Sequence, residues 1–115
     1  MGAMQQMLLG GAGLSVNLSS YSITQTNIHP TVTSPSVTAT PAGGSGTYTY
    51  LWSVINDTGT IATTINSPTL ATSTFKISGA AALDQGVCDV RCQVTDTVTG
   101  LVARSPLCHC VLNAT

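Results

Sequence analysis

A glycine-rich turn that leads into an alternating aromatic segment most limits what this chain can fold into. It covers residues 43–54, with the sequence Gly-Gly-Ser-Gly-Thr-Tyr-Thr-Tyr-Leu-Trp-Ser-Val. Because successive side chains of a strand point to opposite faces, Tyr50, Trp52 and Val54 share one face. A second alternating segment, residues 92–96 (Cys-Gln-Val-Thr-Asp), also ends at a turn. The two segments predict the central strands of a β-sandwich with Trp52 in its core.

The composition favours one folded β domain with few electrostatic partners. At 115 residues the chain can bury a core, and it is rich in Val, Ile and Thr, which favour strands. Only 6% of the residues are charged, none is glutamate, and the net charge is −1. This balance gives no electrostatic footprint for nucleic acid or for an anionic membrane. A surface with so little charge is weakly protected against self-association, so we expect partners to cover much of it.

Residues 1–14 differ from the rest of the chain. They hold all three methionines and no basic residue, and their longest apolar run is residues 7–9. The segment is therefore a poor secretory signal and is too short to span a bilayer, and its glycines disfavour a helix. A disordered N-terminus is one interpretation. The preferred one is a flexible arm that docks on a partner through its apolar side chains, which are Met4, Met7, Leu8, Leu9 and Leu14.

The remaining residues, 15–115, divide into short alternating segments separated by Gly, Pro, Asn and Asp. Strands are expected at 14–18 continuing through 21–23, 31–33, 37–40, 47–55, 60–65, 70–77, 87–95 and 101–112, the last interrupted at Pro106. A crossover at 78–86 is expected to hold one helical turn at 80–83, and no segment has a longer helical periodicity. The pattern predicts an all-β fold, an immunoglobulin-like antiparallel β-sandwich of about seven strands. Its predicted core includes Tyr50, Trp52, Val54, Phe75, Val90, Cys92 and Val94.

Four cysteines lie in the last two predicted strands: Cys88, Cys92, Cys108 and Cys110. Residues two or four apart share a strand face, so each pair of cysteines shares one. Cross-strand disulfides such as Cys92–Cys108 or Cys88–Cys110 are conceivable, and so is a zinc site with His109. The spacings do not match a zinc knuckle, and free cysteine is a good small core residue. Reduced core thiols are the preferred interpretation.

The sequence offers no convincing catalytic set. Glutamate is absent, and no nucleophile motif accompanies His29 or His109. Each histidine is therefore interpreted as structural, and Asp57, Asp84 and Asp96 as turn formers. We expect no enzyme activity, no cofactor and no metal.

Several of these segments resemble a known family. Residues 37–40 (Val-Thr-Ala-Thr), 43–52, 74–75 (Thr-Phe) and 92–96 are similar to the immunoglobulin-like (PKD-like) domains of tailed-bacteriophage virion proteins. The start at residues 7–11, Met-Leu-Leu-Gly-Gly, is similar to the openings of some small phage structural proteins. Bacterial adhesins and surface-layer proteins carry similar sandwiches. Because residues 37–40 contain no cysteine, the inter-sheet disulfide of antibody domains is excluded.

The resemblance implies a non-enzymatic virion component assembled in the cytoplasm of the bacterial host, where cysteines start reduced. A capsid decoration (cement) protein is favoured, attached through its arm and sandwich edges to major capsid or tail subunits as a homo-oligomer in a symmetric assembly. No nucleic acid or membrane partner is expected. The alternative is a tail or fibre accessory module that binds host-surface carbohydrate or a receptor through loops at 42–47, 56–60 and 96–100.

Overall fold

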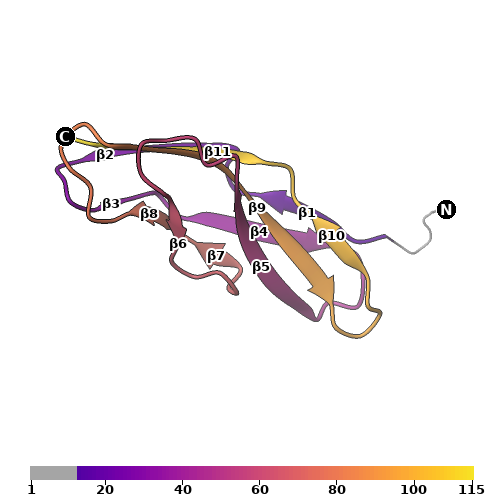
Figure 1. Ribbon diagram of the computed structural model, residues 1–115. Coiled ribbons are helices and arrows are strands. Elements are labelled where there is room, and N and C mark those ends of the chain that lie inside the picture. Colours follow the sequence, from indigo (N-terminus) through magenta and orange to yellow (C-terminus); the bar gives the residue numbers. More distant parts are fainter. Residues whose placement is uncertain (1–12) are drawn as a thin grey trace.

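The computed structural model describes residues 13–115, and its described part is all-β (Figure 1). No helix among these residues is long and apolar enough to cross a membrane. In chain order the strands are β1 (Ser15–Leu18), β2 (Ser22–Asn27), β3 (Val32–Thr33), β4 (Val37–Ala42), β5 (Tyr48–Ile55), β6 (Thr64–Ile65), β7 (Thr72–Ser73), β8 (Phe75–Ile77), β9 (Gln85–Asp96), β10 (Val102–Arg104) and β11 (Cys108–Ala114).

These segments form a sandwich of two sheets, which confirms the predicted fold class. In one sheet β1 pairs with β4 and β4 with β7, while β3 and β8 continue β4 and β7, and β6 pairs with β8. In the other sheet β5 lies along one edge of β9, and β10 and β11 lie along the other edge. Because β1/β2, β3/β4, β7/β8 and β10/β11 are each one interrupted strand, the described segments amount to the seven strands expected.

The first strand changes sheets, which the sequence did not predict. β1 pairs antiparallel with β4, whereas β2 pairs parallel with β11, so the sandwich is not wholly antiparallel. The change occurs at Ser19 and Ser20, between the two segments. Ser19 closes the first ladder, because its N–H donates to the Thr38 carbonyl at 2.9 Å and its Oγ accepts the Thr38 N–H at 2.9 Å. The chain then crosses to the edge of the other sheet (Figure 1).

The core lies between the two sheets around Trp52. This side chain is 2% exposed, and its indole N–H donates to the Leu70 carbonyl at 2.7 Å. Its ring meets Phe75 edge to face, with ring centroids 5.5 Å apart. The inward side chains of β9 complete the core and include the fully buried Val90, Cys92 and Val94. Two residues of the predicted core, Tyr50 and Val54, are half-buried and pack against this cluster.

The crossover between the sheets contains a simple turn in place of the expected helical turn at 80–83. Asp84 stabilises this turn: its carboxylate accepts the Ala81 N–H at 2.8 Å, and its own N–H donates to the Ala81 carbonyl at 3.1 Å. Leu83 adopts a positive φ of 72° and is exposed. A left-handed residue in this position ends any helical continuation.

Two Ser-Pro steps interrupt strands in the same way, one in each sheet. At Ser34-Pro35, residues 34–36 lie opposite residues 74–75, which makes a β-bulge between β3 and β4. Proline has no N–H to give to the ladder, and the serine hydroxyl supplies the missing contact. Ser34 Oγ accepts the Phe75 N–H at 2.9 Å and donates to the Pro35 carbonyl at 2.8 Å.

The second step, Ser105-Pro106 between β10 and β11, repeats these bonds. Ser105 Oγ accepts the Cys92 N–H at 3.0 Å and donates to the Pro106 carbonyl at 2.9 Å. In return the Ser105 N–H donates to the Cys92 carbonyl at 2.9 Å. Both serines are 5% exposed, so no solvent replaces these bonds. The same pair of residue types therefore bends both sheets without leaving a buried backbone donor unpaired.

Replacing either serine should destabilise the domain. Ser34→Ala leaves the Phe75 N–H unpaired, and Ser105→Ala does the same to the Cys92 N–H. Each should lower the free energy of unfolding by about 1–3 kcal/mol. Ser36→Ala, an exposed serine in the same bulge, is the matched control and should change stability by less than about 0.5 kcal/mol. Denaturant unfolding measures all three, and equal stabilities would refute the role given to the buried hydroxyls.

Candidate functional site

Two turns meet at one end of the sandwich, and a buried aspartate joins them. We call residues 43–47 and 96–102 the turn end. Asp96 is fully buried at the last position of β9, and its carboxylate accepts hydrogen bonds from both turns. The Ser45 N–H and hydroxyl donate from one turn, the hydroxyl at 2.7 Å. The N–H groups of Val98 and Thr99 donate from the other, at 2.9 and 3.0 Å.

These donors favour the ionised carboxylate. The Ser45 N–H first, and then that of Thr99, hold the pKa of Asp96 well below its ordinary value. Gly44 completes the arrangement: a Cβ built on it would lie 2.3 Å from Asp96 Oδ2, and its φ is +70°. A second link runs from the Thr97 N–H to the Thr47 carbonyl, 3.0 Å. The glycine-rich turn and the residue 92–96 segment, recognised separately in the sequence, are thus joined by hydrogen bonds into one unit.

The turn end exposes a group of apolar side chains beside its hydroxyl groups. Val98 is 72% exposed, Leu101 42% and Val102 49%, three neighbours in a short stretch of chain. The first described residue, Gly13, also lies here. Its carbonyl oxygen is so close to Gly43 that a Cβ atom added to Gly43 would clash with it. The segment that precedes residue 13 therefore joins the domain beside an exposed apolar surface.

The predicted partner-binding residues fall mostly outside this description. Met4, Met7, Leu8 and Leu9 lie outside the described residues. Leu14 is half-buried and packs against the core of its own domain, so part of its surface is not free for a partner.

The three loops considered for ligand binding do not form one surface. Residues 42–47 and 96–100 lie together at the turn end, but residues 56–60 follow the other end of β5. There the N–H groups of Thr58 and Thr60 donate to the carbonyls of Val87 and Gln85, at 2.8 Å each. This loop therefore lies beside the first residues of β9, whereas Asp96 is the last residue of β9.

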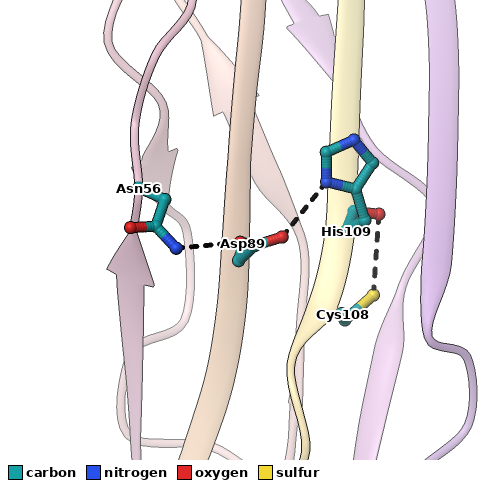
Figure 2. Close-up of polar contacts among 4 residues, drawn as sticks. All are labelled: Asn56, Asp89, Cys108 and His109. Atoms are coloured by element: carbon teal, nitrogen blue, oxygen red, sulfur yellow. Dashed lines mark hydrogen bonds and ion pairs between the residues drawn. The ribbon is translucent and has the colours of Figure 1, made fainter.

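Three polar side chains, Asn56, Asp89 and His109, form a row on the outer face of the sheet that contains β9 and β11 (Figure 2). Asp89 on β9 lies between Asn56 and His109, and its two carboxylate oxygens each bind one neighbour at 3.1 Å. The Asn56 amide, and then the His109 ring, lower the pKa of Asp89. The His109 side chain is 55% exposed, and it lies on the face opposite the buried Cys108.

This row orients an imidazole but aligns no nucleophile on it. Ser22 of β2 is the strand partner of His109, yet among the described residues no hydroxyl hydrogen bonds to the imidazole. The other histidine is bound to backbone: His29 Nδ1 lies 2.7 Å from the Thr115 carbonyl oxygen. What the row can do chemically is present a hydrogen-bonding imidazole to a ligand or partner.

The four cysteines are free thiols in this structure, and all are buried. Burial raises the pKa of Cys92 and of Cys108 to about 11. Cys88 and Cys110 lie directly opposite each other, and the hydrogen bond that the Cys110 thiol donates to Cys88, with burial, raises the pKa of Cys110 and lowers that of Cys88. Of the two bridges considered from the sequence, the register therefore juxtaposes Cys88 with Cys110. Cys108 instead lies opposite Val90. Residues 13–115 contain no group of three or more His, Cys, Asp or Glu side chains placed to hold a metal.

Comparison with known proteins shows the fold alone. No family model matches the chain, and no curated protein matches it. Among solved structures, a nucleoside hydrolase-related hypothetical protein from Saccharophagus degradans, described as associated with carbohydrate metabolism, is similar with a TM-score of 0.59 and 16% identity. The match covers 90% of this chain and 26% of that one, so this chain spans about a quarter of its neighbour's length.

Acid should destabilise the domain partly through Asp96. Because its folded pKa lies below the unfolded value of about 3.9, its stabilisation is complete above that pH and is lost as the pH falls further. Asp96→Asn should lower the unfolding midpoint at neutral pH and show a smaller additional loss between about pH 4 and pH 2. Thermal unfolding across this range measures the effect. Identical acid sensitivity in the variant and the wild type would show that the carboxylate is not the titrating group.

The thiols should be free and unreactive in the folded protein. A raised pKa keeps the thiolates of Cys92, Cys108 and Cys110 scarce at pH 8. Burial blocks access to all four thiols, including Cys88, whose pKa is lowered. Iodoacetamide should therefore modify no cysteine of the folded chain and all four after denaturation without reductant. Mass spectrometry counts the adducts, and a Cys88–Cys110 or Cys92–Cys108 linkage would contradict the expectation while leaving the fold unaffected.

Proposed function

We propose that this chain is a non-enzymatic structural module of a virion that attaches to neighbouring subunits through its turn end and N-terminal arm. The observation that carries the proposal is the position at which the arm joins the domain. Gly13 lies against the Gly43 turn, at the same end as the exposed Val98, Leu101 and Val102. The apolar residues of the arm and those of the turn end can therefore contact one partner together.

The energetics of the arm favour attachment over independent order. Fixing a glycine-rich backbone costs about 1–2 kcal/mol per residue, and burial of one large apolar side chain contributes about 1.5–3 kcal/mol. The four large apolar residues at positions 4 and 7–9 offset only part of that cost by themselves. The exposed apolar side chains of the turn end and backbone hydrogen bonds to the partner would supply the remainder. A capsid decoration protein, held at many copies on a symmetric shell, is the specific form that we favour.

One observation favours the alternative, a tail or fibre module that binds host-surface carbohydrate or a receptor. The turns at 42–47 and 96–100 converge and expose several hydroxyl groups. Carbohydrate sites usually present exposed aromatic rings as well. Trp52, the single tryptophan, is buried. The attachment role is therefore the better supported of the two.

Removal of the arm should abolish attachment without unfolding the domain. A variant lacking residues 2–13 should keep the unfolding midpoint of the full chain, because the described core begins at residue 14. Tagged full-length and truncated chains are incubated with virus particles purified from the source of the sequence, and bound protein is quantified after sedimentation. Full-length protein should co-sediment at saturable stoichiometry, and the truncated chain should not.

Matched variants separate the arm from the turn end. Replacing Met7, Leu8 and Leu9 by Ser keeps the length of the arm and should weaken binding as much as deletion does. Val98→Ser with Leu101→Ser tests the turn end in the same assay. Full occupancy by the truncated chain would show that the arm is passive, and binding to glycans in place of particles would favour the alternative function.

A further inference from the structure

β2 is an edge strand, and among residues 13–115 the outward backbone groups of Thr24 and Thr26 have no partner, whereas those of Ser22 bind the Ser20 hydroxyl. Its inward groups belong to the ladder with β11: the carbonyls of Tyr21 and Asn27 accept hydrogen bonds at 2.9 Å, the latter from Thr115. Because alternate residues of a strand direct their N–H and C=O groups to opposite edges, those of Thr24 and Thr26 point away from β11. A second strand placed here would find donors and acceptors already aligned.

The other strand edges in the described part of the chain are shorter or obstructed. β5 is long, but the Trp52 N–H on its open side donates to the Pro68 carbonyl at 2.8 Å, so a loop covers its centre. β1 has four residues and β6 two. β2, with six residues and the Ser20 hydroxyl bound only at Ser22, therefore forms the longest open edge among the described strands.

β2 lacks the features that usually protect an edge from pairing. Natural sheets place lysine, proline, a bulge or an inward charge at such positions. Residues 22–27, Ser-Ile-Thr-Gln-Thr-Asn, contain neither a charge nor a proline, and no charged residue occurs anywhere from 13 to 56. Nothing in this strand repels a second copy of itself.

Exposed apolar side chains flank both ends of this edge. Tyr21, just before β2, is 44% exposed, and Ile28, just after it, is 75% exposed. An antiparallel arrangement of two identical strands brings the beginning of each beside the end of the other. With the two-fold axis at Gln25 that is proposed below, Ile28 of the partner subunit lies opposite Ser22, and His29 of the partner subunit lies opposite Tyr21.

We propose that two copies of this chain associate by antiparallel pairing of their β2 edges about a two-fold axis at Gln25. In this register Thr24 faces Thr26 of the partner subunit, and the two symmetric pairs exchange about four backbone hydrogen bonds. The contact is isologous, which means that both subunits use the same surface. It joins the sheet that contains β5, β9, β11 and β2 in one subunit to the same sheet in the other. The inference rests on the proposed assembly role and names the surface through which copies meet.

Charge substitutions test the register directly. Thr24→Lys with Thr26→Lys places like charges opposite each other across the axis, and Thr24→Asp with Thr26→Asp does the same with the opposite sign. Each doubly substituted chain should dimerise about tenfold or more weakly than the wild type. An equimolar mixture of the two should regain dimers as heterodimers. Sedimentation equilibrium gives the constants, and unfolding midpoints check that each variant folds.

A proline substitution tests the backbone bonds. Thr24→Pro removes an outward N–H that has no partner within the chain and leaves the β11 ladder complete. It should abolish the dimer, whereas Thr24→Val, which keeps the N–H and the branched side chain, should retain it. A wild-type chain that is monomeric at every concentration would overturn the proposal, and so would a mixture of the oppositely charged variants that does not associate.

The arm serves to separate this proposal from the attachment role. The chain lacking residues 2–13 should still dimerise, because the edge is intact, although it should no longer bind particles. Loss of the dimer on truncation would identify the arm as the segment that occupies the edge and would overturn pairing between two β2 strands. A truncated chain that dimerises and also binds particles would leave the edge proposal standing and refute the attachment role.

Discussion

The burial of one face of β9 is the constraint on which the rest of the structure depends. Val90, Cys92 and Val94 are completely excluded from solvent, and each such side chain contributes about 1.5–3 kcal/mol to folding. β9 is paired along both edges, with β5 on one side and with β10 and β11 on the other. Trp52 faces Cys92 from β5, and its ring meets Phe75 of the opposite sheet. Pairing with β9 places β5, β10 and β11 directly, and Phe75 joins β8 of the opposite sheet to the same centre.

Much of this arrangement could be predicted, because alternation determines which face a side chain occupies. The pattern at 87–95 placed four side chains inward, and the aromatic segment at 47–55 placed Trp52 in the core. Alternation does not determine which edges pair. The change of sheet at Ser19 and Ser20 depends on hydrogen bonds to Thr38 in a distant segment, and nothing local marks it.

The turn end shows the same limit of sequence reasoning. Asp96 was expected to form its own turn, which it does through Val98 and Thr99. Its bonds to Ser45 join residues 51 positions apart, so no local pattern reveals them. Gly44 carries the one available signal, a glycine whose missing side chain makes room for a carboxylate. The serine-proline steps were recognised only as breaks, because the role of their hydroxyls requires knowledge of the opposite strand.

The parallel pairing of β2 with β11 has a mechanical consequence. The two strands run in the same direction over six paired residues, and Thr115 continues the ladder by bonding to Asn27 and His29. The chain begins its described course beside Gly43, at the opposite end of the sandwich. Tension applied between those two ends acts along the strands, so it shears the whole ladder at once instead of opening it bond by bond. A domain held by its arm and pulled from its other end would resist extension with all of these hydrogen bonds sharing the load.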